Sequence, residues 1–233
     1  MTNGSKGLYF NADKLPNATE AYVCWIDVMG MGPTMSRSTK TAANFIFKLH
    51  TAVVNSQTDG VKLFPVMDGV YATSNDKDEI LSFLISVFGD LAEEFIYEEN
   101  NPYRFIPKGA VAYGPVIDGG NVGSGASRDL ADEEEYKSSI LLGIPVIQAF
   151  KSEDSAPPFG VHVHESARTF SSDDDDPMPY VWWDWFINLD LDGNLEDELM
   201  SYYEWCESNS NKISYPSEKI NEHRALSKEY FSK

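Results

Sequence analysis

The sequence predicts an α+β fold in which helices cover one face of an antiparallel-rich sheet. Three observations support this prediction: a continuous apolar run at 21–28, an Asp-Gly pair inside two alternating segments at 61–74, and amphipathic stretches at 39–55 and 77–98. A continuous apolar run is typical of a buried central strand, and apolar residues three and four apart are typical of a helix. Asp-Gly between alternating apolar residues is typical of a two-residue hairpin turn, here Asp68-Gly69.

The remaining elements follow in chain order. Residues 29–38 are rich in Gly, Pro and Ser and are predicted to be a loop, and Pro102 ends the helix that begins near 77. The later segments are a strand at 104–119, a strand fragment or loop feeding a short helix at 138–150, and a strand at 158–165. Because both faces of the hairpin carry apolar residues, we expect a partner subunit or a ligand to cover the second face of the sheet.

The length of 233 residues and mass of 26.1 kDa fit one domain. We expect a leader at 1–18, a main domain at 19–166, and an extension at 167–233 that packs on the same domain. The extension contains an acidic loop at 171–177, a strand-like aromatic run at 180–191, and two helical segments at 195–209 and 217–231.

Charge and cysteine content exclude several classes of protein. A formal charge of −19 disfavours nucleic-acid binding, and a polyphosphate substrate would need metal ions to enter such a field. Cys24 and Cys206 are expected to stay reduced. We see no signal peptide and no run long enough for a membrane span, so the sequence favours a cytoplasmic protein with neither nucleic-acid nor membrane partners.

Two aspartates are the first candidates for chemistry. Asp27 ends the apolar strand and Asp68 lies at the hairpin tip, so both carboxylates converge if the strand lies beside the hairpin. Paired carboxylates bind hard divalent cations, and a triphosphate can complete the coordination. The alternative is that Asp27 only ends a strand and Asp68 only favours a turn.

The segment Gly30, Met31 and Gly32 follows the Asp27 strand and precedes a helix, where backbone amides suit phosphate oxygens. The alternative is a flexible connection, because this segment is neither a Walker loop nor a dinucleotide fingerprint.

Two other patterns are weaker. His162 and His164 alternate on a strand, but without a third ligand a surface or cross-strand role is favoured over a metal site. The stretch 190–201 is not a calcium loop, because Leu195 and Ser201 stand where Gly and Glu are required. Asp192-Gly193-Asn194 is predicted instead to be a turn that caps a helix.

Four segments together resemble the class III nucleotide cyclases: "WIDVMGMG", "FPVMDGVYA", "PKGAVAYGPVIDGGNVGSG" and "LLGIPVIQAF", spanning about 21 to 151. In that family an Asp-Ile-x-Gly-Phe stretch follows the first strand, and Asp27 to Met31 is similar to it. A second Asp lies on a hairpin, normally after Gly, and Asp68 follows Met67 in the corresponding place.

The resemblance implies a ferredoxin-like catalytic fold and a homodimer with active sites across the interface. It implies that Asp27, Asp68 and the Val28 carbonyl hold two divalent ions, Mn²⁺ or Mg²⁺, and that the ribose 3′-hydroxyl attacks the α-phosphate while pyrophosphate leaves. Gly30, Met31 and Gly32 would then lie near the phosphates.

The departures from the family pattern concern base recognition. Phe64 and Ile144 stand where adenylate cyclases carry a base-reading Lys and Asp, and neither side chain can hydrogen-bond a base edge. Ile147 and Lys151 stand where an Asn and an Arg usually serve the ribose and the transition state. The cation that neutralises developing charge would therefore be Lys151, Lys108 or Arg104.

Retained metal-binding aspartates with altered base positions are similar to the pyrimidine cyclases of bacterial anti-phage (Pycsar) systems. That likeness implies cyclic UMP or cyclic CMP, with UTP favoured as substrate and a separate effector protein reading the product. In the leader, Phe10 is a candidate ring for stacking on the base, although packing against the core is the plainer role. An atypical adenylate or guanylate cyclase and a catalytically silent nucleotide-binding or dimerisation module remain as alternatives.

Overall fold

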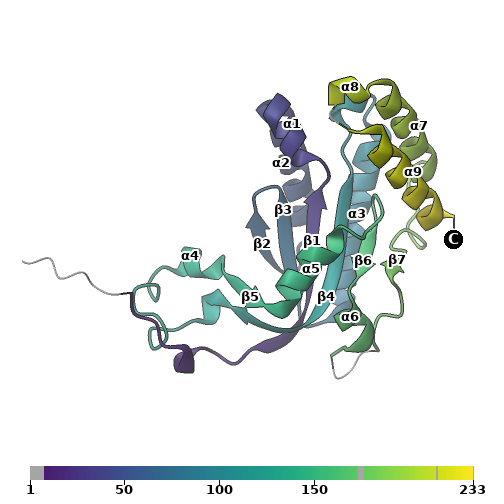
Figure 1. The fold of residues 1–233 in the computed structure, drawn as a ribbon. Helices are drawn as coiled ribbons and strands as arrows, with labels where there is room; N and C mark the ends of the chain where they lie inside the picture. Colours follow the sequence, from purple (N-terminus) through teal and green to yellow (C-terminus); the bar gives the residue numbers. More distant parts are fainter. Residues whose placement is uncertain (1–7, 173–175, 214, 233) are drawn as a thin grey trace, which may run out of the picture.

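The computed structural model describes residues 8–172, 176–213 and 215–232, shown in Figure 1. The strands are β1 (Thr19–Val28), β2 (Lys62–Val66), β3 (Gly69–Ser74), β4 (Pro107–Asp118), β5 (Leu141–Gly143), β6 (Val161–Val163) and β7 (Trp182–Trp183). The helices are α1 (Met31–Arg37), α2 (Thr39–Asn55), α3 (Lys77–Tyr97), α4 (Glu134–Ser138), α5 (Ile144–Glu153), α6 (Glu165–Thr169), α7 (Leu195–Ser208), α8 (Ser210–Ile213) and α9 (Ser217–Phe231). Within these ranges we find no helix with the length and apolarity of a membrane span.

The described strands form one seven-stranded sheet in the order β2-β3-β1-β4-β6-β7, with β5 paired to β4. All pairings are antiparallel except that of β4 with β6. The predicted α+β class with an antiparallel-rich sheet is therefore confirmed. The long central strands β1 and β4 lie side by side, so both ends of β1 are fixed by neighbours.

Apolar clusters differ on the two faces of the sheet. One face packs against α2 and α3 and contributes Cys24, Ile26 and Val28 to the main core. The other face carries Val23 and Trp25 and is crossed by α5, as Figure 1 shows. Because side chains alternate along a strand, Trp25 and Asp27 lie together on the α5 side.

Local signals explain where the long helices begin. The Ser38 hydroxyl accepts a hydrogen bond from the Thr41 amide at 3.2 Å, and the Asp76 carboxylate accepts one from the Glu79 amide at 3.1 Å. These are N-cap contacts, which satisfy amides left unpaired in the first helical turn. The predicted turn before α7 is also confirmed, because Asn194 caps that helix by accepting from the Asp197 amide at 3.2 Å.

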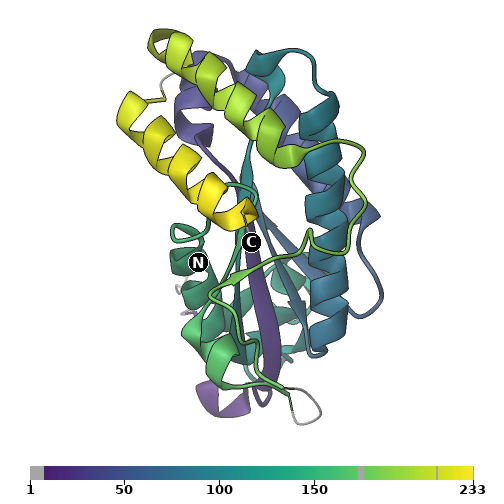
Figure 2. The same cartoon turned by 90° about the vertical axis from the view of Figure 1, so that its right-hand side faces the viewer.

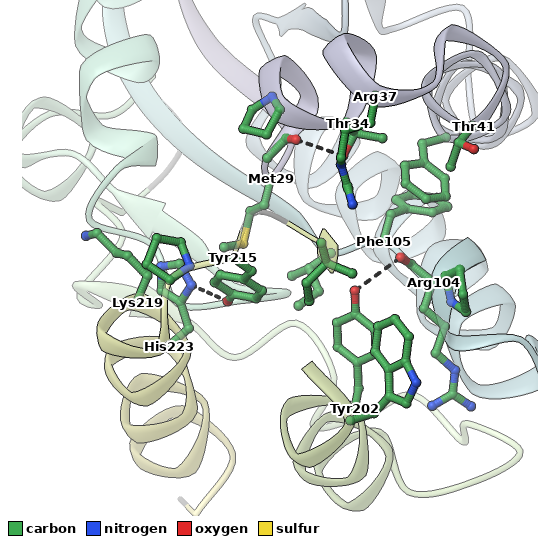
Figure 3. Close-up of a pocket in the computed structure, with 18 residues that line it drawn as sticks. Met29, Thr34, Arg37, Thr41, Arg104, Phe105, Tyr202, Tyr215, Lys219 and His223 are labelled. Carbon is green, nitrogen blue, oxygen red and sulfur yellow. Dashed lines mark hydrogen bonds between the residues drawn. The ribbon is translucent and has the colours of Figure 1, made fainter. Parts of the chain in front are cut away.

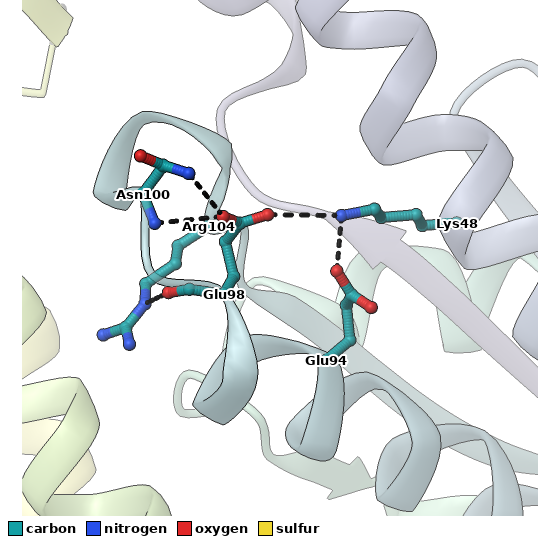
Figure 4. A network of polar contacts seen from close by, with 5 residues as sticks. All are labelled: Lys48, Glu94, Glu98, Asn100 and Arg104. Atoms are coloured by element: carbon teal, nitrogen blue, oxygen red, sulfur yellow. Dashed lines mark hydrogen bonds and ion pairs between the residues drawn. The ribbon is translucent and has the colours of Figure 1, made fainter.

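Polar contacts join α2, α3 and the approach to β4, as Figure 4 shows. Lys48 of α2 pairs with Glu94 and, at 3.6 Å, with Glu98 at the end of α3. The Asn100 amide donates to the Glu98 carboxylate at 3.0 Å, and Arg104 Nε donates to the Glu98 carbonyl at 2.7 Å. The hydrogen bond from Asn100 is the main cause that lowers the pKa of Glu98. Arg104 therefore helps to fix the loop that connects α3 to β4.

Two sequence expectations are wrong in detail. The predicted loop at 29–38 contains α1, because Pro33 occupies the first helical turn, where a missing amide proton costs nothing. The aromatic run 180–191 contains only the two-residue strand β7. Within this run, Trp185 packs its indole ring into the core, with 5.6 Å between the centroids of the Trp185 and Phe88 rings. The Trp185 indole nitrogen donates a hydrogen bond to the Phe159 carbonyl at 2.7 Å.

The hairpin turn is shifted by one residue from its predicted position. Val66 pairs with Gly69, so the two turn residues are Met67 and Asp68 rather than Asp68 and Gly69. Met67 takes the left-handed conformation with φ +52°. Within β3, a Cβ on Gly69 would lie 2.3 Å from the Trp25 indole ring. Gly69 is thus required by close packing within the sheet, and the turn falls on the residues before it.

The C-terminal helices α7 and α9 stand beside one end of the sheet and run next to each other, as Figures 1 and 2 show. Leu199, Tyr203 and Tyr230 belong to the same apolar cluster as β1, α2 and α3. The Tyr203 and Ser227 hydroxyls share a hydrogen bond of 3.0 Å that joins the two helices. The proposed domain boundaries stay a prediction, and residues 1–7 of the leader and 173–175 of the acidic loop lie outside the described residues.

Candidate active site

Asp27 and Asp68 lie together at the end of β1. Asp27 pairs with Gly69 across the β1–β3 ladder, which places the hairpin tip and its Asp68 directly beside the strand end. The charge of Asp68 is one of the causes that raise the pKa of Asp27. The convergence expected from the sequence is therefore present, and Asp68 remains a turn residue although the turn is shifted by one position.

Two further charged side chains approach Asp27 from β4 and α5. Lys108 pairs with Asp27 across the β1–β4 ladder, so both side chains point to the α5 side of the sheet. Its buried ammonium lies 3.6 Å from the Glu153 carboxylate and donates to the Asp154 carbonyl at 3.2 Å. Glu153 ends α5 and carries a raised pKa, caused first by burial. The site thus gathers Asp68, Glu153 and Lys108 around Asp27.

Asp27 is the most perturbed group of this cluster. Its pKa is raised from 3.8 to about 7, first by burial, then by the charges of Glu153 and Asp68. The Val28 amide and Lys108 oppose the rise only partly. The Oδ1 atom of Asp27 is buried and has no hydrogen-bond partner among the described residues. A carboxylate in this state gains strongly from any nearby positive charge.

The donor set fits a hard divalent cation. Carboxylate oxygens are the ligands that Mg²⁺ and Mn²⁺ prefer, and the unpartnered Oδ1 of Asp27 supplies a site where such an ion can bind. Within the described ranges, no group of three or more His, Cys, Asp or Glu side chains has the geometry to hold a metal by itself. Asp27 and Asp68 therefore need further oxygen ligands, of the kind that a triphosphate and water provide.

The turn after β1 leaves open space beside the backbone. Gly30 has φ +73° and caps α1, and a Cβ on Gly30 or Gly32 would meet no atom within 4 Å. Met31 is buried in the core. The predicted phosphate contacts of Gly30, Met31 and Gly32 stay a prediction.

An aromatic cluster adjoins Asp27 on the same face. The Trp25 ring lies 4.5 Å from Tyr71 and 5.6 Å from Phe150, measured between ring centroids. The Trp25 indole nitrogen is buried without a partner among the described residues. Phe64, expected in the base region, pairs with Tyr71 but is only 2% exposed, and the Lys62 ammonium covers it at 5.1 Å from the ring centroid. In the single chain the Phe64 ring is therefore buried and offers no exposed face on which a base could stack.

The other expected base and ribose residues are exposed in the single chain. Ile144 and Ile147 are exposed on α5, and Lys151 lies one turn further along and is also exposed. Phe10 is exposed and precedes β1, whereas Asp27 is near the far end of that ten-residue strand. The single chain brings Lys108, not Lys151, beside Asp27, and Arg104 is engaged in the contacts of Figure 4.

Sequence reasoning missed Glu153, Trp25 and Phe150. Trp25 carried a usable signal, because it lies two residues before Asp27 on a strand and must share its face. Glu153 and Phe150 carried none, because only the packing of α5 across β1 and β4 brings them to the site.

His162, His164, Cys24 and Cys206 belong to no metal-binding group in the described part of the chain. His164 caps α6 by accepting from the Ser166 amide at 3.0 Å, and burial lowers the pKa of both His162 and His164. Cys24 and Cys206 are both free and buried, and burial raises the pKa of each thiol to about 12. These groups serve packing and capping.

Comparisons with known proteins give the following matches. No protein-family model and no curated protein sequence matches the chain. The guanylyl cyclase domain of the RhoGC fusion protein from the aquatic fungus Blastocladiella emersonii is similar with a TM-score of 0.47 and 17% identity, over 65% of this chain and 85% of that chain. The guanylate cyclase domain of RhGC from Catenaria anguillulae, solved in complex with GTP, gives 0.48 and 16% over 65% and 81%. The adenylate/guanylate cyclase/hydrolase from Silicibacter pomeroyi gives 0.44 and 14% over 63% and 76%. At such TM-scores and identities, these likenesses decide neither substrate nor activity.

Proposed function

We propose that this chain is a metal-dependent nucleotide cyclase of the class III type that converts UTP to 3′,5′-cyclic UMP and pyrophosphate. One observation carries the proposal: the Asp27 carboxylate has a buried oxygen without a hydrogen-bond partner among the described residues and lies beside Asp68 at the end of β1. This arrangement supports a cation site, and the motif order around it resembles that of the class III cyclases.

Each residue of the site has a role in this proposal. Asp27, Asp68 and the Val28 carbonyl hold two divalent ions. When bound, such ions supply positive charge to phosphate oxygens and lower the pKa of the ribose 3′-hydroxyl. Lys108 holds Glu153 in place and limits the negative charge felt by Asp27.

The substrate is oriented by the backbone beyond the strand. The amides that follow Gly30 bind phosphate oxygens and align the α-phosphate with the 3′-oxygen. The 3′-hydroxyl loses its proton to water, and its oxygen forms a bond to the α-phosphorus as the bond to the leaving pyrophosphate breaks. Lys151 of a second chain faces the developing charge.

We infer a preference for a pyrimidine from the absence of hydrogen-bonding side chains at two positions that read the base in adenylate cyclases. Phe64 and Ile144 supply no hydrogen-bonding group where adenylate cyclases carry a Lys and an Asp. Apolar and aromatic walls suit a base held by stacking, and the Trp25 cluster lies on the same face as Asp27. Cyclic UMP would act as a second messenger in anti-phage defence, read by a separate effector protein. Cytidylate cyclisation, or cyclisation of ATP or GTP by atypical contacts, is the alternative product chemistry.

Exposed apolar residues near the site support a homodimer. Ile144, Ile147 and Phe150 face solvent on α5, and Met67 at the hairpin tip is 82% exposed. A second copy covering this surface would complete each site with groups that one chain does not bring to Asp27, such as Lys151. Sedimentation of the wild type and of Ile147→Glu tests this point, and we expect the variant alone to be monomeric.

The decisive experiment incubates the protein with each of the four nucleoside triphosphates and Mn²⁺, followed by identification of the cyclic product. We expect cyclic UMP from the wild type and none from Asp27→Asn or Asp68→Asn. Asp59→Asn, in an exposed loop, is the matched control and should keep full activity. Full activity in either site variant would refute the two-metal proposal.

The same experiment addresses a silent nucleotide-binding or dimerisation module. That alternative predicts no turnover of any nucleotide at any metal concentration. Mn²⁺ binding, measured by calorimetry on wild type and Asp27→Asn, then separates a metal site without turnover from two incidental aspartates.

A further inference from the structure

A cavity of about 250 Å³ lies where the C-terminal helices meet the turn after β1 (Figure 3). One wall is Met29 and Gly30 with the start of α1 and α2, and a second is the segment 102–106 before β4. The wall from the C-terminal extension comes from α7, from Ile213 and from residues 215–223. The cavity adjoins the turn whose amides are proposed to bind phosphate, but the proposed cyclase activity gives no role to its aromatic lining or to Arg37.

Aromatic rings make this cavity suitable for a flat molecule. Phe45 and Phe105 lie 5.1 Å apart on the side of the main domain. Tyr202 and Trp205 stack at 5.9 Å with 19° between their planes on α7. Tyr215 closes another side, where its hydroxyl and His223 Nδ1 share a hydrogen bond of 2.5 Å that fixes the ring, as Figure 3 shows. A planar ring can pack against such faces with little loss of side-chain freedom, because these rings are already positioned.

The charge of the lining differs from that of the whole chain. The chain has 37 Asp and Glu residues and a net charge of −19, yet no Asp or Glu lines this cavity. Arg37, Arg104 and Lys219 do line it. A cavity with cations and no carboxylate, in so acidic a protein, favours a ligand that carries negative charge.

The three cations are not equivalent. The Arg104 guanidinium points away from the cavity in Figure 3 and is held by Glu198 at 2.9 Å, and the Lys219 ammonium pairs with Glu222 at 2.8 Å. Arg37 pairs with no carboxylate in the described part of the chain and donates only to the Lys212 carbonyl, from α1 to α8. Arg37 is therefore the cation available to a ligand.

We propose that this cavity is a binding site for a small planar ring molecule with one anionic group, with its ring between the aromatic walls and its anion on Arg37. A bound ligand would contact Met29 and Gly30. These two residues directly follow β1, the strand that carries Asp27 near its end. The site is thus placed to act as an effector site on the turn that follows the candidate active site.

Two probes of matched shape test the proposal by calorimetry and fluorescence. 1-Anilinonaphthalene-8-sulfonate carries a ring system and a sulfonate, and N-phenyl-1-naphthylamine is its neutral counterpart. In Arg37→Gln we expect sulfonate affinity to fall at least about tenfold, the loss of one charge-assisted contact, and naphthylamine affinity to change less than about twofold. Thr41→Phe, which fills the cavity, should weaken both probes, and Lys40→Gln on the same helix should change neither.

Competition then distinguishes the two sources of such a ligand. Displacement of the sulfonate by cyclic UMP assigns the site to a ring-bearing phosphate, and displacement by indole-3-acetate assigns it to a ring-bearing carboxylate. The proposal fails if neither displaces the probe at millimolar concentration, or if Arg37→Gln and Thr41→Phe leave sulfonate binding unchanged. It also fails if Ile147→Ser alone abolishes binding, because the probe would then lie on α5. Circular dichroism of each variant checks folding, and no outcome depends on nucleotide turnover.

Discussion

Replacing Asp27 with Asn should stabilise the fold in the absence of metal, and only at neutral or alkaline pH. Asp27 titrates at 3.8 in the unfolded chain and at about 7 in the folded protein. Between these values the folded state holds a proton that the unfolded state has lost. Stability therefore falls as the pH rises from about 4 to about 7, and the loss remains complete above that range. An Asn side chain carries no charge to bury, so the variant avoids this loss.

The size of the effect follows from the pKa of Asp27. A rise of about three pH units corresponds to roughly 4 kcal/mol, at 1.36 kcal/mol for each unit. Because Asp27 is only partly buried, water screens the charge, and we expect a gain of about 1 to 3 kcal/mol for Asp27→Asn at pH 8. For a chain of this length, each kcal/mol raises the melting temperature by roughly 2 to 4 °C.

Thermal denaturation at pH 4 and pH 8, with a chelator or with excess Mn²⁺, measures this effect. With the chelator, the variant should melt above the wild type at pH 8 and at the same temperature at pH 4. With Mn²⁺ the order should reverse at pH 8, because an ion bound only by the folded wild type at a thousand times its Kd adds about 4.1 kcal/mol. Asp59→Asn serves as the control. Equal destabilisation of Asp27→Asn at both pH values would refute the reasoning, because it would mean that the Asp27 side chain makes favourable contacts without an ion.

Three further predictions concern the same end of the sheet. Met67→Gly should raise the free energy of unfolding by about 1 kcal/mol in urea denaturation, because Met67 adopts a left-handed conformation that glycine takes without strain; an equal or lower stability would contradict this assignment of strain. Gly69→Ala should lower the stability by more than about 1 kcal/mol in the same assay, since the new Cβ would lie 2.3 Å from the Trp25 ring, and an unchanged midpoint would show that the indole moves freely. Glu153→Gln should lower the pKa of Asp27 below about 7, measured by NMR titration of the carboxyl carbon, because it removes the larger of the two nearby negative charges; an unchanged value would mean that the Glu153 charge does not act on Asp27.

The sequence was sufficient to predict the long elements of this protein. The helices near 39–55 and 77–98, the buried strand at 21–28 and the cap at Asn194 follow from local periodicity and capping residues, and each is present in the structure. The convergence of Asp27 and Asp68 was also predictable, because a strand beside a hairpin leaves few arrangements for its end.

Short segments were predicted less well, because tertiary contacts decide them. Residues 31–37 form α1 although Gly and Pro favour a loop, and most of 180–191 packs aromatic rings into the core instead of forming a strand. In both segments the local propensity is weak, so burial of side chains such as Met31 and Trp185 determines the conformation.

By itself, the sequence determined the class of fold, the acidic character of the chain and the pair of aspartates at the end of one strand. Only the tertiary structure placed Gly69 within β3, where the Trp25 ring leaves no room for a side chain, and so left Met67 and Asp68 as the turn residues. Only the tertiary structure brought Lys108 and Glu153 to Asp27 and enclosed an aromatic cavity beneath the C-terminal helices. The physical reason is the same in each case: these contacts join residues far apart in the chain, and their energies arise from packing and burial that no local pattern records.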